Sequence, residues 1–202
     1  MAKQNEYKAS LTREQFLFYE MRVVARLRLQ EETPENSLAK VLDGNLFQFP
    51  TERMVASIFQ TCQRRLDALQ SDDLVKEIAF GSTEDAKLIN LYSMMRYNRL
   101  VWDFMVTVIG EKYRTKDDSI TQSDLNLFMI RLQEQSDTVA SWSDNTIQKI
   151  KQVLKRALVE SGYLTSAKAT ELQPVYPCET LLVAIQANRD QDAFTAFNYF
   201  PV

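Results

Sequence analysis

Positively charged side chains gather in one window of the sequence, residues 143–168, and the chemistry open to them is the binding of phosphate. The window holds five basic residues against two acidic ones, a net charge of +3, in a chain whose net charge is −3. Its basic residues are Lys149, Lys151, Lys155, Arg156 and Lys168. Because the whole chain is mildly acidic, no global field attracts nucleic acid, and any such contact must come from a local patch.

The spacing of apolar residues predicts a helix over about 145–161, with a buried face formed by Ile147, Ile150, Leu154, Ala157 and Leu158. We expect Lys151 and Lys155 on the opposite face, with Lys149 and Arg156 on its flanks. Lys151 and Lys155 are one turn apart and repel each other, and a phosphate backbone would relieve that repulsion and release counterions. The alternative is an ordinary solvated helix face, which is the more frequent meaning of this pattern when the sequence stands alone.

Two adjacent arginines, Arg64 and Arg65, form a second candidate contact near the end of a helix predicted to follow Pro50. They could clamp a phosphate, or they could be two unrelated surface arginines. We expect the nucleic-acid-binding residues to be Lys149, Lys151, Lys155, Arg156, Arg64 and Arg65.

Catalytic chemistry finds little support in the residue types. The chain has no histidine, so it has neither a Ser-His nor a Cys-His pair and no imidazole ligand for a metal. Its carboxylate doublets lie at predicted helix ends or in loops, where acidic residues complement the helix dipole. It has only four glycines and no glycine-rich phosphate loop. We therefore expect a protein that is not an enzyme and has no cofactor and no metal.

The composition is that of a globular protein, with 202 residues, 45% hydrophobic and 25% charged. The longest apolar run, Leu100–Ile109, contains Asp103 and is about half the length that a membrane-spanning helix needs. The N-terminal residues lack the apolar core of a signal peptide, and Cys62 falls among apolar helix positions. We expect a cytoplasmic chain with no membrane contact and with Cys62 buried.

Helical periodicity extends over nearly the whole chain and predicts an all-α, compact multi-helix bundle. A capping box at Thr12–Gln15 predicts the start of the first helix, Thr33-Pro34 the second, and Ser82–Asp85 a long central helix over about 83–109. Further helices are expected after Thr121, over about 145–161 and over about 179–188, and all four glycines (44, 81, 110 and 162) fall at predicted helix ends. The halves 1–80 and 81–202 could be two helical subdomains or one compact domain.

Three features of the sequence leave alternatives open. The helices at about 34–43 and 51–69 could form a helix-turn-helix, but the connection from Gly44 to Pro50 is long and favours a plain helical hairpin. Gly162-Tyr163-Leu164 resembles the exit into a winged helix, although no wing hairpin follows. The aromatic tail (Phe194, Phe197, Tyr199 and Phe200) either packs on the core or docks a partner protein.

Short segments between about Tyr7 and Tyr163 carry a resemblance by their order and spacing rather than by any single motif. These segments are Lys8–Thr12, Glu20 with Arg22, Gly44–Gln48, Arg64–Leu69, Asp103–Met105, Val108-Ile109, Glu111-Lys112, Val139–Ser143 with Thr146, and Leu158–Tyr163. Taken together, they resemble the BrxA family, the small accessory proteins of BREX bacteriophage-defence systems.

This resemblance implies an all-helical fold similar to that of the antitermination factor NusB, and a DNA-binding accessory role in phage defence without catalytic residues. The expected partners are double-stranded DNA and other BREX proteins. Binding is expected to be dominated by phosphate and weakly sequence-specific. The alternatives are a protein–protein scaffold of the defence complex that touches no nucleic acid, which the net charge and the aromatic tail favour, and an RNA-binding protein.

Overall fold

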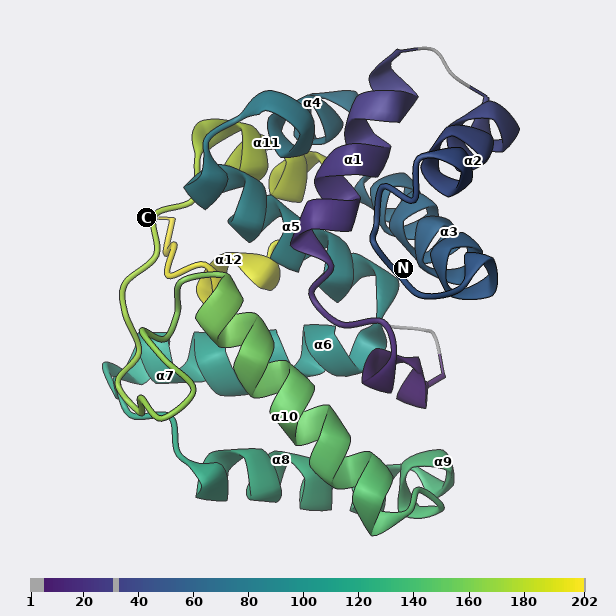
Figure 1. Cartoon of the computed structure of the whole chain (residues 1–202). Coiled ribbons are helices and arrows are strands. Elements are labelled where there is room, and N and C mark those ends of the chain that lie inside the picture. The colour runs from purple at the N-terminus through teal and green to yellow at the C-terminus, as the bar shows by residue number, and fades with distance from the viewer. Residues whose placement is uncertain (1–5, 31–32, 202) are drawn as a thin grey trace.

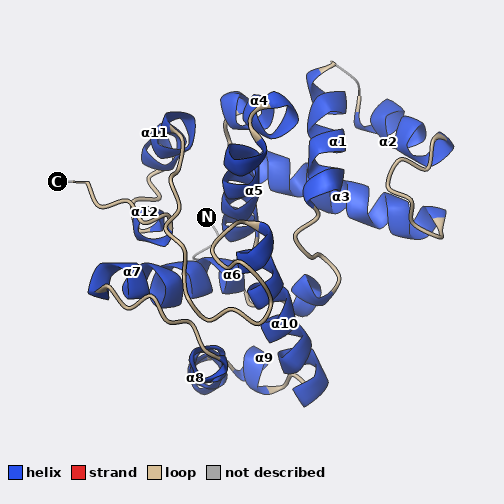
Figure 2. Ribbon diagram, turned by 60° about the vertical axis from the view of Figure 1, so that its left-hand side comes forward, coloured by secondary structure: helices blue, strands red, loops and turns tan. Residues whose placement is uncertain are grey.

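The computed structural model describes residues 6–30 and 33–201, and it is helical throughout (Figures 1 and 2). Within those residues the β-structure amounts to an isolated bridge between Ser119 and Glu171. The expected all-α fold is confirmed. No helix of the described chain is both long and apolar enough to cross a membrane.

The N-terminal part consists of a short 3₁₀ helix and four α-helices. They are η2 (Ala9–Thr12), α1 (Phe18–Leu29), α2 (Pro34–Asp43), α3 (Glu52–Leu69) and α4 (Asp72–Phe80). The side chains of Thr33, Thr51 and Ser71 each accept a hydrogen bond from a backbone N–H of the helix that follows, which caps α2, α3 and α4. Helix α1 packs against both α3 and α4, and α2 lies beside α3 (Figure 1).

The first helix starts later than its capping-box motif predicts. The Thr12 hydroxyl donates to the carbonyl of Ala9 inside η2, and α1 begins only at Phe18. Between them the chain turns at Leu17, which has a left-handed backbone with φ 53° and ψ 39°. The side-chain amide of Asn90 donates a hydrogen bond of 2.7 Å to the carbonyl of the preceding residue, Phe16. Tertiary hydrogen bonding therefore outweighs the capping-box motif here.

The central helix is interrupted, which corrects the expectation of one helix over 83–109. Helix α5 (Thr83–Tyr97) ends at Asn98, whose extended backbone (φ −126°, ψ 114°) opens α6 (Arg99–Phe104). The Asn98 side chain accepts from the Leu100 N–H, the local competition with helical bonding that makes asparagine a capping residue. Helix α6 continues through a π-helical turn, η3 (Met105–Gly110), into α7 (Glu111–Thr115).

Gly110 therefore lies inside a helical run and not at a helix end. A Cβ at this position would lie 2.4 Å from Oγ1 of Thr195, so glycine permits the close approach of α12 (Ala193–Ala196). Gly162 follows a helix as predicted and has a φ of +86°.

The remaining helices are α8 (Gln122–Gln135), α9 (Asp137–Ala140), α10 (Asp144–Glu160) and α11 (Glu179–Ala187). The helix expected after Thr121 is confirmed, and Thr121 and Asp124 form a capping box by exchanging side-chain-to-backbone hydrogen bonds. Helix α10 crosses the face of the molecule diagonally in Figure 1, between α1 above and α8 below. Irregular backbone follows Leu164, and its one β-pairing in the described chain is the bridge at Glu171, so a wing hairpin is absent there.

Apolar residues from both halves of the chain share one core, which extends from Tyr7 to Phe197. A buried ion pair lies within it: the Arg96 guanidinium donates to Asp190 at 2.5 Å and to the Tyr92 hydroxyl at 3.1 Å. Phe197 of the aromatic tail is buried against Tyr92, so this part of the tail packs on the core.

Candidate nucleic-acid interface

Helix α10 presents the predicted buried face to the core. Its first turn is capped by Ser143, whose hydroxyl accepts from the Thr146 N–H. The apolar residues expected on the inner face are all buried: Ile147, Ile150, Leu154, Ala157 and Leu158. Lys149 and Arg156 are exposed, whereas Lys155, expected on the solvent face, is half-buried.

Lys151 departs from the prediction, because it is buried and not on the solvent face. Its side chain is 7% exposed, and its ammonium donates to Oδ1 of Asn126 on α8 at 2.8 Å. On an α-helix, residues three and four apart share a face, so Lys151 lies beside buried Ile147 and Leu154. Helix α8 packs against that flank and encloses the Lys151 side chain, so its ammonium is not accessible to a phosphate.

The exposed cations of α10 lie on a single flank. Lys149 and Arg156 are seven residues apart, two helical turns, and therefore point to the same side. Arg156 pairs with Glu160 at 2.6 Å but keeps 67% of its side chain exposed. An exposed pair of this kind contributes little energy, so the guanidinium is free to exchange its partner for a phosphate.

Arg65 also departs from the prediction, because it is a buried internal strut and not an outer phosphate contact. Its side chain is 1% exposed, and its guanidinium donates to the backbone carbonyls of Glu14, Gln15 (2.8 Å) and Phe16 (3.3 Å). Burial lowers the pKa of Arg65, against the raising effect of nearby groups that include Glu14. The side chain thus fixes the shape of the loop that precedes α1.

Arg64, its neighbour, is exposed and belongs to a polar stripe along α3. Four exposed residues recur there at intervals of four, three and four, which places them on one side of the helix. We call them the α3 stripe: Arg53, Ser57, Gln60 and Arg64. No acidic residue lies between Glu52 and Asp67 in the sequence, so this stretch of helix carries only positive charge.

The α3 stripe leads into a groove between the loop before α1, the start of α3 and the end of α10, which we call the arginine groove. Its cavity volume is about 850 Å³. Three arginines line it, one from each wall: Arg13, Arg53 and Arg156. Arg13 and Arg53 form no ion pair within residues 6–30 and 33–201.

Two carboxylates, Glu20 and Glu160, also line the arginine groove. Glu160 is neutralised by Arg156. Burial raises the pKa of Glu20 above its ordinary value, with the help of the negative charge of Glu160 and against a backbone hydrogen bond. With three cations against two carboxylates, the groove has a net positive charge.

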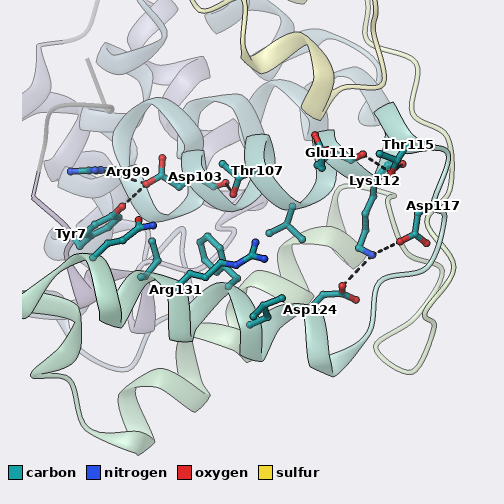
Figure 3. Close-up of a pocket in the computed structure, with 15 residues that line it drawn as sticks. Tyr7, Arg99, Asp103, Thr107, Glu111, Lys112, Thr115, Asp117, Asp124 and Arg131 are labelled. Atoms are coloured by element: carbon teal, nitrogen blue, oxygen red, sulfur yellow. Dashed lines mark hydrogen bonds and ion pairs between the residues drawn. The ribbon is translucent and has the colours of Figure 1, made fainter.

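A second, polar groove separates α6, η3 and α7 from α8 and has a cavity volume of about 530 Å³ (Figure 3). The Lys112 ammonium spans its mouth, 2.9 Å from Asp117 and 3.2 Å from Asp124. Burial lowers the pKa of Lys112, but the hydrogen bonds to the two aspartates outweigh this effect and raise it. The charged residues of the lining are Arg99, Lys112, Arg131, Asp103, Glu111, Asp117 and Asp124. Four carboxylates against three cations make this groove the poorer site for a polyanion.

Sequence reasoning missed Arg13 and Arg53. Arg53 could have been found from its spacing to Arg64 and from the absence of acidic residues between them. Counting net charge over a whole sequence window hides this pattern. Arg13 could not, because its place depends on the loop that Arg65 holds. Metal chemistry gains no support from the described residues, which contain no cluster of three or more potential metal ligands.

Comparison with known proteins identifies relatives over most of the chain. A family model described as BrxA matches residues 5–189. The BREX protein BrxA of Bacillus cereus (strain H3081.97) is 38% identical over 168 residues, which cover 83% of this chain and 84% of that protein. The BREX protein BrxA of Escherichia coli O9:H4 (strain HS) is 25% identical over 173 residues, 86% of this chain and 81% of that protein.

The fold is also found in a solved structure. The crystal structure of an uncharacterized protein from Magnetospirillum magneticum superposes with a TM-score of 0.81 and covers 96% of this chain and 98% of that chain, at 20% sequence identity.

Proposed function

The chain belongs to the BrxA family of BREX defence systems, and from this premise we propose that it is a non-enzymatic, cytoplasmic protein that binds double-stranded DNA. Other BREX proteins are the expected protein partners. The proposal rests on the arginine groove and the α3 stripe, which share Arg53 and Ser57 and together present four arginines.

The spacing of the α3 stripe suits duplex DNA. Arg53 and Arg64 are eleven residues apart, about 16 Å along the helix axis at 1.5 Å per residue. The major groove of B-DNA is about 12 Å wide, so two arginines at the ends of this stripe could reach phosphates on its two sides. Arg156 and Lys149 of α10 add positive charge on the flank nearest the arginine groove.

Contacts of this kind give affinity without much sequence preference. Arginine contacts with phosphate fix the position of a protein on DNA but do not read the bases. Ser57 and Gln60 are the polar side chains of the stripe that could touch base edges, and two such residues provide limited discrimination. We therefore expect weakly sequence-specific, strongly salt-dependent binding.

The test is an affinity measurement on duplex DNA across a salt series. Binding should weaken steeply with salt, and the double variant R53A/R64A should bind more weakly and with a shallower salt dependence, because two phosphate contacts are lost. Lys76→Ala is the matched control, because Lys76 is an exposed cation of α4 that lines neither the arginine groove nor the α3 stripe. Absence of binding to duplex DNA at low salt would reject the proposal.

The second candidate is a scaffold that binds another BREX protein and no nucleic acid. It is favoured by large apolar side chains that the fold leaves exposed, among them Phe80 of α4, Val183 of α11 and Tyr176. A scaffold would bind its partner protein and would not retard duplex DNA in a gel-shift assay. RNA binding is separated from both by competition of duplex DNA against RNA of equal length.

A further inference from the structure

The arginine groove is not only basic, because apolar and aromatic side chains form its floor and walls. Phe16, Phe18, Tyr19, Phe49 and Met54 all line it. Its volume of about 850 Å³ lies within the range of sites that enclose small organic ligands, about 300–1,000 Å³. A surface for phosphate alone needs no such cavity.

Tyr19 is the aromatic residue with a free face. It is 55% exposed, and within the described residues its ring makes no aromatic or cation–π contact. Phe18 differs, because Arg22 and Lys87 lie 5.7 Å and 5.8 Å from its ring centroid. Met54, 44% exposed, stands on α3 as a polarisable apolar neighbour across the groove.

The backbone of this wall is held in a conformation that costs energy. Leu17 lines the groove with φ 53° and ψ 39°, a left-handed geometry that L-residues with a side chain rarely adopt. Strain of this type persists where the surroundings enforce it, and here Arg65 and Asn90 bind the carbonyls just before Leu17. The Tyr19 side of the groove is thus preformed.

An exposed aromatic face beside arginines is the chemistry that proteins use for unpaired nucleotides. Bases stack on aromatic rings regardless of sequence, and neighbouring cations hold the backbone phosphates. A duplex keeps its bases stacked on one another and cannot offer one to Tyr19. The net positive charge of the groove favours an anionic occupant over an apolar or basic peptide, since Arg13 and Arg53 have no carboxylate partner within the described residues. The aromatic lining beside those arginines favours a nucleotide, which carries a planar base and a phosphate in one unit.

We propose that the arginine groove accepts an unpaired nucleotide, with its base stacked on Tyr19 beside Met54 and its phosphate against Arg13 or Arg53. The proposal rests on the proposed DNA-binding function and deepens it: the preferred substrate is duplex DNA with a single-stranded segment, such as a tail at its end. The α3 stripe binds the duplex, and the groove takes the unpaired base next to it.

The experiment compares two tailed duplexes of equal charge. Both carry a short single-stranded tail of the same length. In one duplex the tail has its bases, and in the other it is abasic, so that only the sugars and phosphates remain. Wild-type protein should bind the base-bearing tail more tightly by at least about fivefold, the lower limit expected for stacking of one base. Tyr19→Ala should abolish this preference, whereas Tyr19→Phe, which keeps the aromatic ring, should retain it.

Tyr176→Ala provides the control, because Tyr176 is a tyrosine with 79% exposure that does not line the groove. Equal wild-type affinity for the two tails would overturn the inference while the duplex-binding function stands. A preference that survives in Tyr19→Ala would also overturn it, as would a Tyr19→Ala defect confined to the capture of another BREX protein. Absence of binding to every DNA would overturn both the inference and the proposed function.

Discussion

The adjacent residues Arg64 and Arg65 should respond to mutation in opposite ways. Arg65→Ala removes three hydrogen bonds to the carbonyls of Glu14, Gln15 and Phe16, all made by a side chain that is buried. Arg64 is exposed on the α3 stripe, and alanine there removes a charge and almost no packing. The first change should unfold the protein more easily, and the second should weaken only DNA binding.

The size of the Arg65 effect follows from the hydrogen bonds that it makes. A hydrogen bond to a charged group contributes about 1.5–3 kcal/mol, but the cost of burying the guanidinium offsets part of the sum. Removing one partner from a buried charged network typically costs about 3–5 kcal/mol, and we expect Arg65→Ala to fall in this range. Arg65→Lys keeps the charge but lacks the planar fork that reaches several carbonyls, so it should lie between alanine and wild type.

The assay is urea denaturation followed by circular dichroism, with duplex-DNA affinity measured on the same samples. Arg64→Ala should change the free energy of unfolding by no more than about 0.5 kcal/mol, as surface substitutions usually do. It should also reduce the salt dependence of DNA binding by about one phosphate contact. An Arg65→Ala protein as stable as wild type, with a DNA defect equal to that of Arg64→Ala, would refute the assignment of Arg65 as an internal strut.

Three further substitutions test other parts of the structure. Lys151→Met should leave the salt dependence of DNA affinity unchanged, because the Lys151 ammonium is bound to Asn126, and should lower the free energy of unfolding in urea by about 1 kcal/mol. A shallower salt dependence would show that Lys151 contacts DNA. The folded-state pKa of Glu20 is raised, so wild type loses stability as pH rises from the ordinary pKa of glutamate through that raised value. Glu20→Gln does not titrate there and should become more stable relative to wild type over the same pH range. A difference in unfolding free energy that is equal at acid and neutral pH in urea melts would contradict this. Asp190→Ala should destabilise the fold by about 3–5 kcal/mol, because it leaves the Arg96 guanidinium buried without its carboxylate; an unchanged Tm in thermal denaturation would exclude that role.

Helical periodicity and capping residues predicted much of the fold. Thr33, Ser82, Thr121 and Ser143 each cap the helix that follows. The five apolar residues predicted for the inner face of α10 are buried, beside Val153 and Lys151, which that prediction left out. These features depend on neighbours within about four residues, so the sequence reports them directly. The domain boundary near residue 80 stays a prediction.

The errors lie where distant segments decide the outcome. Asn98 breaks the central helix, and Gly110 continues one because α12 packs against it. Lys151 and Arg65 carry the charges of surface residues, yet α8 encloses the first and the loop before α1 encloses the second. A helical wheel separates an apolar face from a polar one, but it does not show which polar flank a neighbouring helix will cover.

If arginines around one groove bind the phosphates of DNA, the salt dependence of affinity must change when one of these arginines is removed. Arg156→Ala is compared with Arg114→Ala, because each arginine is exposed and paired with a glutamate on its own helix, but only Arg156 lines the groove. Phosphate binding by Arg156 should make the slope of log affinity against log salt shallower by about 0.9 in Arg156→Ala and leave it at the wild-type value in Arg114→Ala. Equal slopes for wild type and both variants would contradict it.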